Sequence, residues 1–115
     1  MKLQMEAQHL RFRISEKELA TLLDGGAVDN LTTLDEGHHI GQRVTLADSD
    51  HASLDTRPTP WQLRLPRTAV AAYARRLPTR EGLHFHLPRA ESAVLEIQFD
   101  VDVRDSARTR LSSSS

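Results

Sequence analysis

A strand-to-helix unit that occurs twice constrains the fold of this 115-residue chain more than any other feature. In the first copy, residues 12–15 alternate apolar and polar before an amphipathic segment over 16–23. In the second copy, residues 63–66 alternate in the same way before a segment over 67–77. A period of two predicts a half-buried strand, and apolar residues at i, i+3 and i+4 predict a half-buried helix. The apolar helix positions Leu19, Leu22 and Leu23 recur 51 residues later as Val70, Tyr73 and Ala74.

Local signals define the ends of both predicted helices. Ser15 and Glu18 have the spacing of a capping box, in which each side chain accepts a hydrogen bond from the backbone N–H of the other residue. The glycines within residues 24–26 favour an end to the first helix, because glycine readily adopts the left-handed conformation that follows a helix. Pro66 suits the first turn of the second helix, and Pro78 stops it.

Alternating segments predict the strands, and the polar segment 48–60 predicts a long loop near the middle of the chain. We expect an α+β fold in which a mainly antiparallel sheet packs one face against the two helices. A β-α-β-β unit in each half suggests a pseudo-duplication; coincidence is the alternative, since strand–cap–helix is a common local solution. One domain spans residues 1–104, and a disordered tail spans 105–115. The predicted strands are 2–5, 9–14, 27–34, 39–47, 61–65, 82–87 and 94–104.

Composition excludes several classes of function. The chain has no cysteine, so disulfides, thiolate zinc sites and cysteine nucleophiles are excluded. It has no 18-residue apolar run and no apolar segment near its N-terminus, so we expect neither a membrane span nor a secretory signal. A cytoplasmic protein without membrane contacts is the natural interpretation. The formal net charge of −1 gives no general attraction to nucleic acid.

Arginines on predicted strands are the first candidate ligand-binding group. Arg11 and Arg13 share the polar face of one strand, and Arg64 occupies the equivalent place in the second unit. Together, Arg11, Arg13 and Arg64 are candidates to bind a phosphate or carboxylate, since guanidinium groups recognise both bidentately. The alternative is cross-strand pairing with acidic residues of the last strand, which the near-neutral total charge favours.

His84 and His86 are the candidate metal ligands. Their i, i+2 spacing places both imidazoles on one face of a predicted strand, as in some zinc and copper sites. Two ligands do not complete a site, so a third must come from another histidine or from a carboxylate such as Glu96. The alternative is a pair of solvent-facing histidines. A divalent metal at these residues is the one cofactor considered, and no catalytic residue is assigned.

The segment 57–80 is rich in arginine. Residues 56–80 contain six arginines and no acid, a composition that suits binding to an anion or to nucleic-acid phosphates. The chain has only one Trp, one Tyr and three Phe, and several of these are needed in the core. A stacking platform for bases is therefore not expected, and neither is a nucleic-acid partner.

The N-terminal segment resembles a family of small uncharacterised bacterial proteins. Residues 1–5, followed by 9–15 and Glu18, match that family's pattern of a short strand, a turn and a Leu-Arg-Leu-type strand that enters a Ser/Thr-capped helix. The turn at 6–8 departs from the Gly-Asn turn of the family. The resemblance covers about the first 25 residues of this sequence and implies architecture rather than an activity.

Three functions fit these observations. The first is a small non-enzymatic binding or regulatory module that acts through a polar sheet face bearing arginine and histidine, with a protein partner or a second copy joined through an edge strand. The second is a metal-dependent or histidine-based enzyme that uses His84 and His86. The third is an anion or nucleic-acid binder centred on residues 57–80.

Overall fold

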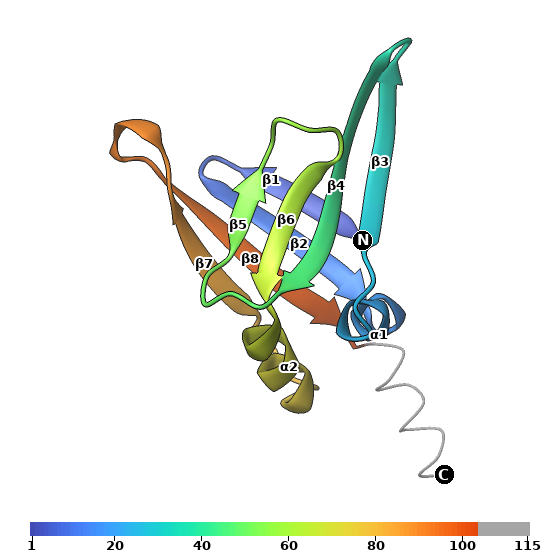
Figure 1. Cartoon of the computed structure of the whole chain (residues 1–115), viewed down its shortest axis with the longest axis vertical. Helices are drawn as coiled ribbons and strands as arrows, with labels where there is room; N and C mark the ends of the chain where they lie inside the picture. The colour runs from blue at the N-terminus through green and yellow to red at the C-terminus, as the bar shows by residue number, and fades with distance from the viewer. Residues whose placement is uncertain (104–115) are drawn as a thin grey trace.

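Two four-stranded sheets account for most of the computed structural model, which describes residues 1–103 (Figure 1). Sheet A has the order β1 (Lys2–Glu6), β2 (His9–Ser15), β8 (Val94–Asp102) and β7 (Leu83–Pro88). Sheet B has the order β3 (Val28–Asp35), β4 (His38–Ala47), β6 (Trp61–Pro66) and β5 (Ser53–Asp55). Two α-helices, α1 (Glu16–Leu23) and α2 (Arg67–Arg75), and a 3₁₀ turn at Ala90–Ser92 complete the fold.

The predicted α+β class is confirmed, with mostly antiparallel strands and two helices. The strands are divided between two sheets, whereas the sequence pattern suggested one. Both helices lie at the same end of the two sheets (Figure 1), where each follows directly on the strand that precedes it. No helix in the described part of the chain has the length and apolar character that crossing a membrane requires.

The two halves of the chain have the same topology. In each sheet the two central strands are parallel, β2 with β8 and β4 with β6, and each outer strand is antiparallel to its neighbour. The first β-α-β-β unit, β2-α1-β3-β4, places β2 in sheet A and the hairpin of β3 and β4 in sheet B. The second unit, β6-α2-β7-β8, places β6 in sheet B and the hairpin of β7 and β8 in sheet A. Because the two halves of the chain exchange hairpins in this way, each sheet contains strands from both halves. The predicted pseudo-duplication corresponds to this repeated arrangement of strands and helices.

The core lies between the two sheets and is closed at one end by the helices. Phe12 and Phe99 of sheet A and Leu63 of sheet B are fully buried. The helices contribute Leu22 and Tyr73, which are also almost completely buried. These side chains belong to a single apolar cluster that draws on both halves of the chain, so burial ties the repeated units into one body.

Local structure follows the sequence closely, with two differences. The capping box is present, with Glu18 N–H donating to Ser15 Oγ at 3.1 Å and Ser15 N–H donating to Glu18 Oε1 at 2.9 Å. The predicted loop 48–60 contains the three-residue strand β5, which is too short to show a period. Helix α2 ends at Arg75 rather than at residue 77. The predicted disordered tail, residues 105–115, lies outside the described residues.

Candidate functional site

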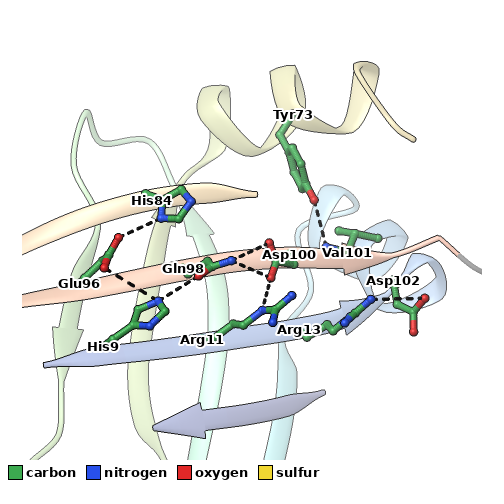
Figure 2. A network of polar contacts seen from close by, with 10 residues as sticks. All are labelled: His9, Arg11, Arg13, Tyr73, His84, Glu96, Gln98, Asp100, Val101 and Asp102. Carbon is green, nitrogen blue, oxygen red and sulfur yellow. Dashed lines mark hydrogen bonds and ion pairs between the residues drawn. The ribbon is translucent and has the colours of Figure 1, made fainter. Parts of the chain in front are cut away.

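The outer face of sheet A carries most of the polar residues that the sequence singled out (Figure 2). The parallel register of β2 and β8 sets His9 opposite Glu96 and Arg11 opposite Gln98. On the other side of β8, His86 of β7 also lies opposite Glu96. Because side chains on one face recur at every second residue, three strands contribute to one continuous polar surface. We call it the polar face: His9, Arg11, Arg13, His84, His86, Glu96, Gln98, Asp100 and Asp102.

The arginines of the polar face are paired with carboxylates of β8. Arg11 Nε donates to Asp100 Oδ2, and Arg13 Nη2 lies 3.9 Å from Asp102 Oδ1. Asp100 is only 7% exposed, because the backbone of Gly82 covers it. A Cβ atom at residue 82 would stand 1.8 Å from Asp100 Oδ1, so only glycine fits there. Arg11 is thus engaged within the sheet, whereas Arg13 only approaches Asp102, and its buried Nε has no hydrogen-bond partner among the described residues.

Three imidazoles surround the carboxylate of Glu96. His84 Nδ1 lies 3.0 Å from Glu96 Oε1, His86 Nε2 lies 3.9 Å from the same oxygen, and His9 Nε2 lies 4.0 Å from Oε2. The hydrogen bond with His84 is the main cause that lowers the pKa of Glu96. Within residues 1–103, no group of three or more His, Cys, Asp and Glu side chains is arranged to hold a metal ion. Metal binding by His84 and His86 stays a prediction.

A different cluster of arginines surrounds a cavity of about 590 Å³ where the edge of sheet B meets sheet A. Arg57 follows β5, Arg64 lies on β6, and Arg89 follows β7. The register of β5 and β6 sets Ser53 directly opposite Arg64. Both residues therefore contribute to the same wall of this cavity. We call this cavity the arginine pocket: Gln8, Ser53, Leu54, Asp55, Thr56, Arg57, Arg64, Arg89 and Leu95.

The arginine pocket has three guanidinium groups and one carboxylate. Arg57 holds that carboxylate bidentately, with Nε 2.9 Å from Asp55 Oδ1 and Nη2 3.0 Å from Oδ2. Arg89 Nη2 donates to the backbone oxygen of Leu54 at 3.3 Å. Within residues 1–103, Arg64 and Arg89 form no salt bridge with a carboxylate. The pocket is therefore cationic, although the charge of Arg64 contributes, after the hydrogen bonds from Arg57, to lowering the pKa of Asp55.

The sequence grouped Arg64 with Arg11 and Arg13, and the structure separates them. Arg64 lies on β6 of sheet B, whereas Arg11 and Arg13 lie on β2 of sheet A. The strands that correspond in the repeat belong to different sheets, so equivalent positions do not meet. Arg89 was not singled out from the sequence, because it falls in a turn whose approach to β5 depends on how the two sheets pack.

A second cavity, of about 560 Å³, lies on the polar face next to β1. Arg11 is the only arginine among its described lining residues, and Asp100 already binds that side chain. Glu6 adds a negative charge to its wall. This cavity therefore offers less to an anion than the arginine pocket does.

The pair of Asp55 and Arg57 gives a first testable property of the arginine pocket. The hydrogen bonds from Arg57 lower the pKa of Asp55 to about 2. We expect the carboxyl carbon of Asp55 to titrate near this pH by NMR, and near the ordinary 3.8 in Arg57→Gln. Stability contributed by the pair is present above pH 3.8 and lost as the pH falls toward 2.

Arg75→Gln is the control for this titration, because Arg75 is exposed on α2 and lies outside the pocket. The midpoint of Asp55 should not move in this variant. A wild-type midpoint close to 3.8 would contradict the bidentate pair.

Comparison of the chain with protein-family models, with curated proteins and with solved structures finds no match. The resemblance of the first 25 or so residues to a family of small bacterial proteins is neither supported nor refuted by this result. The geometry of the molecule therefore carries the functional argument alone.

Proposed function

We propose that this protein is a small non-enzymatic binding module that takes an anionic ligand in the arginine pocket. One observation carries the proposal: Arg64 and Arg89 line a cavity of about 590 Å³ and form no salt bridge with a carboxylate of residues 1–103. The one carboxylate among the described lining residues, Asp55, is held by Arg57. Guanidinium groups present several N–H donors in a planar fork that matches phosphate and carboxylate oxygens. An anion in the pocket would give Arg64 and Arg89 charged acceptors, where the protein itself provides only the backbone oxygen of Leu54 to Arg89.

The lining of the pocket favours binding over catalysis. General acid–base chemistry uses groups such as histidine or a free carboxylate near the substrate. The described residues around the arginine pocket include no histidine, and their one carboxylate, Asp55, is held by Arg57. The neutral polar groups are Gln8, Ser53 and Thr56, which supply hydrogen bonds rather than proton transfer at neutral pH.

The polar face is the weaker candidate for the same ligand. A ligand would have to displace Asp100 from Arg11 and would compete with Asp102, which lies 3.9 Å from Arg13. The sequence-based expectation of a binding module is kept, and its site moves from the polar face to the arginine pocket. A protein partner, a homodimer and a cytoplasmic location stay predictions.

Substitution of Arg64 tests the proposal. We expect Arg64→Gln to weaken binding of inorganic phosphate or pyrophosphate by about tenfold or more, since a hydrogen bond to a charged group contributes about 1.5–3 kcal/mol. Isothermal titration calorimetry at low ionic strength measures the change. Binding to the wild type should also weaken as salt rises, because the attraction is electrostatic.

The matched control is Arg75→Gln, which removes the same charge from the exposed side of α2. It should bind the anion as the wild type does. Equal loss in both variants would show that net charge alone sets the affinity, and no binding by the wild type at millimolar anion would refute the proposed function.

A further inference from the structure

The arginine pocket is larger than a single inorganic anion requires, and part of its wall is apolar. Its volume of about 590 Å³ lies within the range of about 300–1,000 Å³ that is usual for small-molecule sites. Leu54 and Leu95 line it together with the three arginines. A ligand that only neutralised the arginines would leave these two leucines against water.

The two leucines are the outermost layer of the core. Leu54 lies opposite Leu63 in the pairing of β5 with β6, and Leu63 is fully buried. Leu95 lies opposite Leu87 in the pairing of β7 with β8, and Leu87 is 7% exposed. Leu54 and Leu95 themselves are half-buried. The core therefore reaches the opening of the pocket from both sheets, and an apolar group there would extend it.

The pocket also joins the two sheets at an edge. Arg64 and Leu54 belong to sheet B, and Leu95 belongs to sheet A. Within residues 1–103, strand β5 pairs only with β6, and all three of its residues line this opening. Arg89, which follows β7, reaches across to the backbone oxygen of Leu54 at 3.3 Å. A ligand in the pocket would contact both sheets at once.

We infer that the ligand is a small amphiphilic anion, with a phosphate or carboxylate group on a short apolar body. The charged group binds Arg64 and Arg89, and the body packs on Leu54 and Leu95 between the sheets. This inference rests on the proposed function and deepens it, because it assigns the class of ligand. Asp55 neutralises Arg57 in the free protein, so a single anionic group is sufficient for the remaining arginines.

A series of phosphates with increasing apolar length tests this assignment. Inorganic phosphate, methyl phosphate, butyl phosphate and hexyl phosphate carry the same charged group, and calorimetry gives their affinities for the wild type. We expect the affinity to rise about two- to fourfold for each methylene that is buried, and to level off once the chain leaves the pocket. Hexanoate carries an alkyl chain on a carboxylate instead of a phosphate. We expect the wild type to bind hexanoate more tightly than acetate.

The outcomes separate this inference from the proposed function. If inorganic phosphate binds as tightly as hexyl phosphate, the amphiphilic ligand is refuted and anion binding stands. If no compound of the series binds, both fail. Co-sedimentation with vesicles of anionic lipid, without binding of butyl or hexyl phosphate, would assign the pocket to a membrane surface and would also overturn the inference.

Substitution of Leu95 locates the apolar body. We expect Leu95→Ser to remove most of the dependence of affinity on the length of the alkyl chain, since each buried CH₂ accounts for about a two- to fourfold change in affinity. Val94→Ser is the matched control, because Val94 is the preceding residue of β8 and is 48% exposed. Val94→Ser should keep the full dependence of affinity on alkyl chain length.

A measurement on the wild type avoids any effect of Leu95→Ser on folding. Nuclear Overhauser contacts between the alkyl protons of bound butyl phosphate and the methyl groups of Leu54 and Leu95 are expected. Contacts to methyl groups outside the arginine pocket, with none to these two residues, would overturn the assignment.

Discussion

Replacement of Phe99 by alanine is expected to lower the free energy of unfolding by about 3–5 kcal/mol. Phe99 is fully buried at the centre of sheet A, where it lies opposite Phe12 of β2 and Leu83 of β7. Its ring meets the ring of Tyr73 edge-to-face, with centroids 6.2 Å apart and planes at 70°, a geometry that aromatic pairs favour. The truncation therefore removes contacts to two strands and to α2.

Urea denaturation followed by circular dichroism gives this change. Val94→Ala is the control on the same strand, because Val94 is 48% exposed, and we expect it to stay within about 0.5 kcal/mol of the wild type. Domains of this size have a total stability of about 5–15 kcal/mol, so Phe99→Ala removes a large share. A loss below about 1 kcal/mol would show that the two sheets do not enclose this side chain.

The sequence predicted the strands well because alternation is a local property. In β8, Ile97 and Phe99 are fully buried, as their places in the alternating pattern predict. In β7, His84 and His86 alternate with the apolar residues, and both histidines are exposed. Strand β5 was not predicted, since its three residues Ser-Leu-Asp complete less than two periods and it is defined by its pairing with β6.

The division into two sheets could not be predicted from the same pattern. Alternation shows that Phe12 and Leu63 each face a core, but it holds no information on which strand lies beside which. The parallel pairings of β2 with β8 and of β4 with β6 join residues far apart in the chain. These pairings depend on the exchange of hairpins between the halves, which is a property of the whole fold.

The same limit explains what was predicted of the candidate site. Arg11 and Arg13 share a face because they are two residues apart on β2, and that local prediction is confirmed. The grouping with Arg64 relied on equivalence in the repeat, and equivalent strands lie in different sheets. Arg89 and Arg64 line one cavity because the two sheets approach each other at β5, so no local pattern marks Arg89 as a site residue.

Replacement of Tyr73 by phenylalanine is the second large effect, and we expect a loss of about 1–3 kcal/mol in the free energy of unfolding. Strand β7 begins at Leu83, opposite Phe99, so β8 has no β7 partner at Val101. There the Val101 N–H donates to Tyr73 Oη at 3.1 Å, and both residues are buried. Loss of the hydroxyl would leave a buried backbone N–H without an acceptor, which costs more than an average hydrogen bond contributes.

Denaturation at pH 7 measures this loss, and Thr32→Val is the control. Thr32 is exposed on β3 and also carries a hydroxyl, so its removal should change the stability by about 0.5 kcal/mol or less. If Tyr73→Phe changes the free energy of unfolding as little as this control does, the Tyr73 hydroxyl is not the acceptor for the Val101 N–H.

The dependence of stability on high pH tests the same group independently. Burial raises the pKa of Tyr73 above its ordinary value of 10.0. Above pH 10.0 a tyrosine in the unfolded chain loses its proton while the folded one keeps it, so the unfolded state binds fewer protons. Stability contributed by this group is therefore complete below pH 10.0 and is lost as the pH rises through the folded pKa. The difference in stability between wild type and Tyr73→Phe should narrow as the pH rises above 10.0, and a difference that stays constant there would contradict the buried hydroxyl.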